Sequence, residues 1–216
     1  MSARPIVVVD YGAGNLTSVE HVLRHLGAPF LTTARPEDLR DAEGVIFPGV
    51  GEAASSMAEL SRTGLDEALR RFVASGRKVL GICIGCQVIF DRSEERDTTC
   101  LGIVGGVVRR FPRYNGLKVP HMGWNAVHVE QAHPLLRGIP QDSAFYFVHS
   151  FYPEPVDARM VVATTDYGFP FASVVATGNL AACQFHVEKS GGVGLALISN
   201  FLAWDGRWEG PCSPGD

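Results

Sequence analysis

The sequence predicts an α/β protein whose sheet is mostly parallel, with antiparallel strands added in the second half of the chain. Two observations lead to this prediction. Short apolar runs alternate with helical patterns up to about residue 92, and from about residue 101 strand-like runs follow one another with few helices between them. The 216 residues show no internal repeat and no low-complexity linker, so we expect one domain over residues 1–216.

The first half of the chain supplies the parallel strands. A continuous apolar run is typical of a strand buried on both faces, and such runs occupy residues 5–10, 44–49 and 78–82. Intervening segments carry apolar residues at helical spacing, and two of them close with a glycine, a common helix end. Helices are expected at residues 15–27, 64–76 and 84–92.

The second half changes character. Strand-like runs occupy residues 101–111, 125–130, 144–152, 159–167, 171–177 and 180–188. Because few helices separate these runs, some of them should pair antiparallel and extend or flank the parallel core. A last helix is expected at residues 192–204, and the Gly/Pro-rich segment 205–216 should form a loose tail.

Composition excludes several classes of function. The formal charge is −4 and the pI is near 6.0, which argues against nucleic acid or an anionic membrane as the main partner. No run of 18 apolar residues occurs, and the first apolar run is too short for a signal peptide. The five cysteines are irregularly spaced and form no disulfide framework, so a cytoplasmic location is the simpler expectation.

The stretch "GICIGC" at residues 81–86 holds Cys83 and Cys86 in a C-x-x-C pattern and also reads G-x-C-x-G around Cys83. A structural zinc site needs four ligands, and no second cysteine pair exists. A redox pair at a strand-to-helix junction is the second interpretation. The flanking glycines favour a third one, a nucleophile elbow in which a strand turns sharply into a helix. Cys83 would then stand at a helix N-terminus, which favours a thiolate, and Cys86 would be a packing residue.

A cysteine nucleophile needs a base, and His186 is the candidate. Glu188 follows two residues later, so in a strand both side chains would lie on one face and the carboxylate could orient the imidazole. The competing interpretation is a surface H-x-E at a strand end. His21 and His25 lie four apart without a third ligand, which is typical of a solvated helix face.

Several motifs together resemble the class I glutamine amidotransferases: "GICIGCQ" (81–87), "FHVEKS" (185–190) and "PGVG" (48–51). More narrowly, "DYGAGNL" (10–16), "KVPHMGWN" (118–125) and "YFVHSFY" (146–152) are similar to the glutaminase subunits of imidazole glycerol phosphate synthases. The resemblance runs from about residue 5 to residue 203. It departs from the family at Cys86 and Val187, where Met and Pro are usual.

The resemblance implies a flavodoxin-like open sheet carrying a catalytic triad of Cys83, His186 and Glu188. The oxyanion would be held by the backbone N–H of Ile84 and by that of Val50 or Gly51. Glutamine would be bound by residues that match the family pattern: Gly51, Gln87, Glu95, Ser150 and Phe151. No metal or organic cofactor is implied.

The implied function is hydrolysis of glutamine through a Cys83 thioester, with ammonia passed to a (βα)8-barrel cyclase subunit that makes imidazole glycerol phosphate in histidine biosynthesis. The expected interface residues are Asn15, Met122, Trp124, Asn125, Tyr146 and Lys189. Two alternatives stay open: a glutaminase subunit of another synthase, and a non-catalytic regulatory subunit of the same fold. The "KVPHMGWN" motif argues against the first, and the intact triad residues argue against the second.

Overall fold

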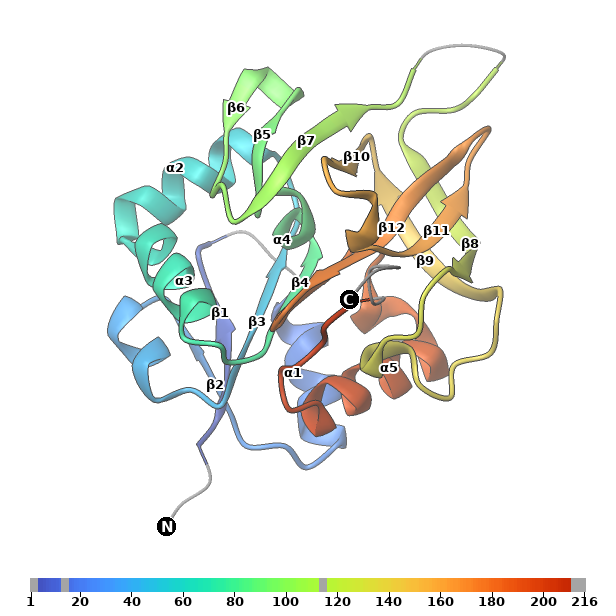
Figure 1. The fold of residues 1–216 in the computed structure, drawn as a ribbon. Coiled ribbons are helices and arrows are strands. Elements are labelled where there is room, and N and C mark those ends of the chain that lie inside the picture. The colour runs from blue at the N-terminus through green and yellow to red at the C-terminus, as the bar shows by residue number, and fades with distance from the viewer. Residues whose placement is uncertain (1–3, 13–15, 113–115, 211–216) are drawn as a thin grey trace.

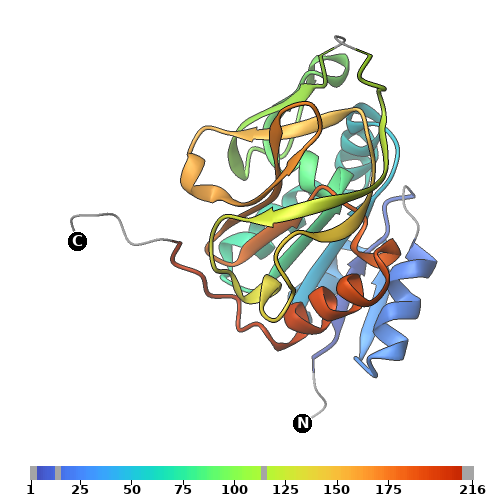
Figure 2. The same cartoon turned by 90° about the vertical axis from the view of Figure 1, so that its right-hand side faces the viewer.

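The computed structural model describes residues 4–12, 16–112 and 116–210. It contains a nine-stranded sheet with helices on both faces and a four-stranded sheet beside it (Figures 1 and 2). Among these residues no helix is both long and apolar enough to cross a membrane.

Five parallel strands form one half of the large sheet. They are β2 (Phe30–Thr33), β1 (Ile6–Val9), β3 (Gly44–Gly49), β4 (Val79–Cys83) and β13 (Leu180–Cys183), in that spatial order. Numbered along the chain, the order is 2-1-3-4-5, which is the flavodoxin-like arrangement. The predicted fold class is therefore confirmed.

Four antiparallel strands complete the large sheet: β12 (Pro170–Thr177), β11 (Val161–Asp166), β8 (His121–Val129) and β9 (Ser143–His149). The smaller sheet consists of β10 (Phe151–Pro155), β7 (Val104–Arg110), β5 (Phe90–Ser93) and β6 (Thr98–Thr99). Strand β9 runs into β10 within two residues, so the segment at Ser150 connects the two sheets.

The helices cover the parallel strands from both sides. Helices α1 (Leu16–His25) and α5 (Gly191–Ala203) pack on one face, and α2 (Ala53–Thr63) and α3 (Leu65–Ala74) pack on the other (Figure 1). Strand β1 shows why its sequence is apolar throughout: Ile6 and Val8 belong to one core, and Val7 and Val9 belong to the other. Both faces of β1 are therefore buried, and neither set of alternating side chains needs to be polar.

Five short 3-10 segments connect these elements: η1 (Pro36–Asp41), η2 (Glu95–Asp97), η3 (Pro134–Leu136), η4 (Ala158–Met160) and η5 (Val187–Lys189). Strand β2 and helix α2 were not among the elements expected from the sequence.

Two expected elements are wrong. The helix predicted at residues 84–92 is a single turn, α4 (Ile84–Gln87), because Phe90–Ser93 leaves it as strand β5 to pair with β7 and β6. The strand-like run 180–188 ends at Cys183, and its last residues enter the 3-10 turn η5. Both errors arise where pairing with distant residues overrides a local pattern.

The segment after α5, which was expected to be loose, is in contact with the body of the protein as far as it is described. The indole N–H of Trp208 donates to the carbonyl of Ala132 at 3.0 Å, and its ring packs 5.1 Å from that of His133. These contacts anchor the start of the segment.

Candidate active site

Cys83 ends strand β4 and is followed at once by helix α4, the strand-to-helix turn of a nucleophile elbow. Its backbone has φ 54° and ψ −106°, a region that costs a non-glycine residue about 1–3 kcal/mol. The side chain is only 4% exposed and lies at the carboxyl end of the parallel strands. Since α4 is one turn long, the thiolate would depend on nearby N–H groups rather than on the dipole of a long helix.

The glycines on either side of Cys83 let the backbones pass closely. A Cβ atom on Gly85 would collide with the carbonyl oxygen of Phe47 in the neighbouring strand β3, and one on Gly81 would lie 2.8 Å from the carbonyl oxygen of Gly85. The G-x-C-x-G pattern therefore has a steric cause, which a simple redox pair would not require.

His186 and Glu188 are brought together by the turn η5 and not by strand alternation. The Nδ1 atom of His186 lies 2.8 Å from Oε1 of Glu188, and both side chains are almost fully buried. Val187, between them, is buried in the core. The hydroxyl of Ser190 donates to the carbonyl of His186 at 2.6 Å and accepts from the backbone N–H of Tyr146, which holds the turn in place.

The electrostatic surroundings favour a protonated His186. Burial on its own lowers the pKa of His186, but the Cys83 thiol and the Glu188 carboxylate raise it to about 10. Glu188 occupies Nδ1, so Nε2 is the nitrogen available to Cys83. Within the described residues Nε2 of His186 has no hydrogen bond of good geometry, although Cys83 is close enough to raise the pKa of His186. A long nucleophile–base distance is common before a substrate is bound.

A cavity of about 280 Å³ lies beside Cys83 and His186. Its lining comes from the turn after β3, from β4, α4 and η2, and from the β9–β10 connection, which are far apart in the sequence. Its lining includes every residue predicted for the oxyanion and for glutamine: Val50, Gly51, Ile84, Gln87, Glu95, Ser150 and Phe151. Glu188 stands behind His186 and does not line it.

The turn after β3 forms one wall of this cavity. Gly51 has φ +106°, a conformation that side-chain-bearing residues rarely adopt, and nothing lies within 4 Å of where its Cβ would be. Val50 is 36% exposed. The backbone at Val50–Gly51 therefore has room to reorient, as an adjustable oxyanion donor would need.

Glu95 also lines the cavity. Its Oε2 accepts the backbone N–H of Ala53 at 2.6 Å, at the first turn of α2. Burial raises the pKa of Glu95, and this backbone bond opposes the rise. Glu95 is the first residue of η2, which follows β5.

Four of the predicted interface residues gather near His186. Met122 and Trp124 are 63% and 58% exposed on β8, and Lys189 is exposed at the end of η5. Tyr146 pairs with His186 through a backbone bond of 2.9 Å, and its ring lies 6.0 Å from that of Trp124.

The other two predicted interface residues differ from this group. Asn125 lies on the opposite face of β8 from Met122 and Trp124, and its side chain donates to the carbonyl of Asp166 at 2.8 Å. Asn15 lies outside the described residues.

The other cysteines that the structure describes offer no second reactive centre. Cys83, Cys86, Cys100 and Cys183 are all free, and burial raises the pKa of the Cys86 thiol well above its usual value, as do the neighbouring Cys183 and Cys83. Cys212 lies outside the described residues. In the described ranges no group of three or more His, Cys, Asp or Glu side chains is placed to hold a metal ion.

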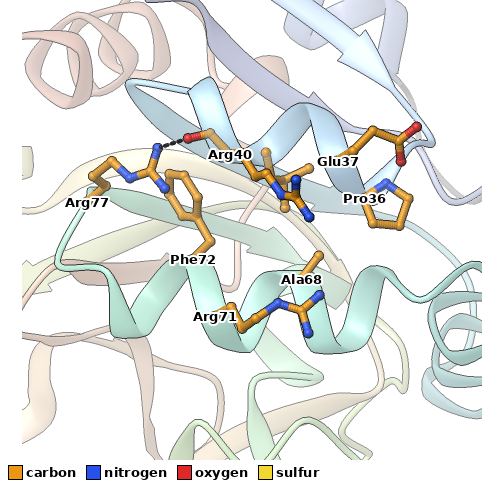
Figure 3. Close-up of a pocket in the computed structure, with 8 residues that line it drawn as sticks. Pro36, Glu37, Arg40, Ala68, Arg71, Phe72 and Arg77 are labelled. Atoms are coloured by element: carbon orange, nitrogen blue, oxygen red, sulfur yellow. Dashed lines mark hydrogen bonds between the residues drawn. The ribbon is translucent and has the colours of Figure 1, made fainter.

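A larger hollow, of about 370 Å³, lies between η1 and α3 (Figure 3). Arg40, Arg71 and Arg77 surround it, and Arg77 donates to the carbonyl of Arg40 at 2.8 Å. Its lining contains no thiol and no imidazole, so size alone does not make it a catalytic site.

Two residues near the chemistry were not singled out from the sequence. Gln184 is fully buried, with Nε2 4.0 Å from the sulfur of Cys83, and His149 lines the cavity. The sequence offered one signal for Gln184: it is a polar residue in an otherwise apolar strand-like run, two residues before His186. His149 lies inside a quoted motif, but nothing local marks its role.

Known proteins resemble this chain in sequence and in fold. The family model described as "Glutamine amidotransferase class-I" matches residues 7–204. The chain is 50% identical over 198 residues to "Imidazole glycerol phosphate synthase subunit HisH" of Dehalococcoides mccartyi, covering 91% of this chain and 96% of that relative. The protein of the same name from Nitratidesulfovibrio vulgaris is 50% identical over 204 residues, covering 91% and 94%. A solved glutamine amidotransferase superposes with a TM-score of 0.73 at 20% identity, over 93% and 98% of the two chains.

Proposed function

Because the chain belongs to the class-I glutamine amidotransferase family, we propose that it is the glutaminase subunit of an imidazole glycerol phosphate synthase, with Cys83 as its nucleophile. One observation carries the assignment: a strained cysteine at an elbow and a histidine paired with a buried glutamate line the same cavity. The names of the relatives favour this synthase over others, and the complete triad argues against a purely regulatory subunit.

The reaction follows from the positions of these groups. The thiolate of Cys83 attacks the side-chain amide carbon of glutamine, and the tetrahedral oxyanion is met by the N–H of Ile84 and by that of Val50 or Gly51. Protonated His186 gives its Nε2 proton to the departing ammonia, which leaves a glutamyl thioester on Cys83.

Water completes the cycle. Neutral His186 takes a proton from a water molecule, which attacks the thioester carbon and releases glutamate and the Cys83 thiol. Glu188 keeps the imidazole oriented and its Nδ1 protonated in both halves of the reaction.

Glutamine is recognised by residues that line the cavity. One oxygen of Glu95 is bonded to Ala53, and we assign the other to the α-ammonium group of the substrate, which needs a carboxylate partner. Gly51, Gln87, Ser150 and Phe151 supply the remaining contacts.

The partner is a cyclase subunit of (βα)8-barrel fold. It docks over Met122, Trp124, Tyr146 and Lys189, because exposed Met and Trp side chains are typical anchors and this surface adjoins His186. Ammonia released beside His186 enters the partner without meeting bulk water, which would protonate it.

The whole chain acts as one domain, and its buried free thiols fit the cytoplasm.

The direct test compares two neighbouring cysteines. Cys83→Ala abolishes glutamine hydrolysis by the assembled complex, and Cys86→Ala, its matched control, leaves most of it. Equal loss in both variants would support a C-x-x-C oxidoreductase instead.

A second test concerns activation by the partner. We expect the isolated chain to hydrolyse glutamine slowly and the cyclase with its nucleotide ligand to raise the rate by orders of magnitude. Full activity of the chain alone would contradict an adjustable Val50–Gly51 turn.

A further inference from the structure

A chain of hydrogen-bonded polar side chains reaches the glutamine cavity at His149. The Nδ2 atom of Asn125 lies 3.3 Å from Nε2 of His121, and Nδ1 of His121 lies 3.0 Å from Nε2 of His149. The Nδ1 atom of His149 lies 2.7 Å from the carbonyl oxygen of Phe151. Both histidines are buried, at 3% and 5% exposure.

The chemistry of its two ends fixes the direction of this chain. The Phe151 carbonyl only accepts, so Nδ1 of His149 carries its proton and Nε2 accepts from His121. His121 is then protonated at Nδ1, and its Nε2 accepts from the Asn125 amide, which only donates. Burial lowers the pKa of His121 to about 4 and that of His149 to about 3, so both rings stay neutral and keep these tautomers.

The chain ends on a group that matters for substrate. The carbonyl of Phe151 also accepts Nε2 of Gln87 at 3.1 Å, so both of its lone pairs are used. Gln87 in turn lies 3.0 Å from Oε1 of Gln184, the residue whose amide nitrogen approaches the sulfur of Cys83. The Ser150–Phe151 segment and the nucleophile therefore belong to one buried network.

The other end of the chain lies on β8. Side chains alternate along a strand, so Met122 and Trp124 point outward while His121 and Asn125 point inward. One strand thus presents the exposed apolar anchors on one face and the start of the hydrogen-bond chain on the other.

We propose that His121 and His149 are positioning residues of the glutamine site: their hydrogen-bond chain holds the Phe151 carbonyl and connects it to β8, the strand that meets the cyclase. This rests on the proposed function. Asn125 then acts through His121 and not as a direct contact with the partner.

The test replaces each histidine by phenylalanine, which keeps the ring and removes the nitrogens. The shape is tolerated, because His121 stacks on Phe147 and Tyr167 and His149 packs against Phe111 and Phe171. Glutaminase activity is measured on the complex with cyclase and its nucleotide ligand. Loss of one hydrogen bond corresponds to about a tenfold change, so His149→Phe raises the KM for glutamine about tenfold and lowers kcat much less.

A conservative variant separates the two parts of the proposal. In His149→Asn the amide nitrogen replaces Nδ1 and keeps the bond to Phe151, but the side chain no longer reaches His121. In this variant the KM for glutamine returns most of the way to the parent value. Its activation by the cyclase falls as it does in His121→Phe. A raised KM with undiminished activation in His121→Phe would overturn the connection to β8. The matched control is His133→Phe, another buried histidine that lies on η3 away from the cavity, and its KM is unchanged.

Nitrogen NMR of the parent chain gives an answer even where a variant fails to fold. Both imidazoles must show the neutral form protonated at Nδ1, and an Nε2-protonated His149 would overturn the proposal. A parent complex that cannot hydrolyse glutamine defeats the proposed function itself, whereas an active parent with an unaltered KM in His149→Phe defeats only the positioning role.

Discussion

Replacing Glu188 by glutamine tests whether a buried carboxylate keeps His186 protonated and directed at Cys83. The parent distance is 2.8 Å, and both side chains are almost fully buried. The pKa of His186 rises from 6.5 to about 10, which corresponds to roughly 5 kcal/mol in favour of the imidazolium at about 1.36 kcal/mol per pH unit. Replacing the carboxylate removes a buried hydrogen bond to a charged group, so roughly 2.5 kcal/mol of this preference is lost.

That loss translates into rate. A change of roughly 2.5 kcal/mol is about a 10²-fold decrease, so Glu188→Gln lowers kcat/KM for glutamine hydrolysis by about that factor. The KM stays within about threefold, because Glu188 does not line the cavity. The amide also donates to Nδ1 and so favours a tautomer that cannot keep the Nδ1 proton.

The pH dependence has a definite sign. The pKa of His186 is raised in the folded protein, so its imidazolium is lost only as the pH climbs toward about 10. Without the carboxylate that pKa falls, and the basic limb of the kcat profile moves to lower pH.

A steady-state glutaminase assay of the complex across pH measures both effects. The control is Glu67→Gln, an exposed carboxylate on α3, which changes neither quantity. Activity of Glu188→Gln within about twofold of the parent, or a basic limb that does not move, would refute the reasoning.

Three further predictions concern packing, assembly and stability. Gly85→Ala lowers Tm by about 5 °C or more, because its Cβ meets a strand carbonyl, while Gly192→Ala on α5 has space and changes Tm little; equal Tm values would contradict the packing argument. Trp124→Ala weakens cyclase binding by about 30-fold in calorimetry, whereas the more exposed Val156→Ala has almost no effect, and an intact affinity for the first would remove β8 from the interface. The stabilisation that His186 gains from its partners is complete below about pH 6.5 and disappears as the pH rises toward 10, so the difference in unfolding free energy between the parent and His186→Gln shrinks from about pH 6 to about pH 9, and a constant difference would exclude the ion pair.

The parallel half of the fold was predictable because its signals are local. The strand predicted at residues 44–49 has the bounds of β3, since a continuous apolar run can only be buried on both faces. The Gly-x-Cys-x-Gly spacing likewise predicted the elbow at Cys83. Close backbone contacts leave no room for a Cβ atom two residues before and two residues after Cys83, so both positions are glycine.

Other parts of the site were not predictable from local patterns. The helix expected at residues 84–92 stops after one turn because Phe90 pairs with Val104 in a second sheet. The His186–Glu188 contact was expected from strand alternation, but the turn η5 makes it. His149 carries no local mark, since its partners come from β8 and β10.

The amino-acid sequence alone determined the fold class and the family and marked Cys83 as the candidate nucleophile, because each depends on residue types at short spacing. Tertiary structure alone decided that the residues around the cavity meet, which tautomers the buried histidines carry and which face of β8 looks toward solvent. The physical reason is that a hydrogen bond between residues 28 apart, such as His121 and His149, depends on how strands pair in space, and strand pairing is an outcome of the whole fold.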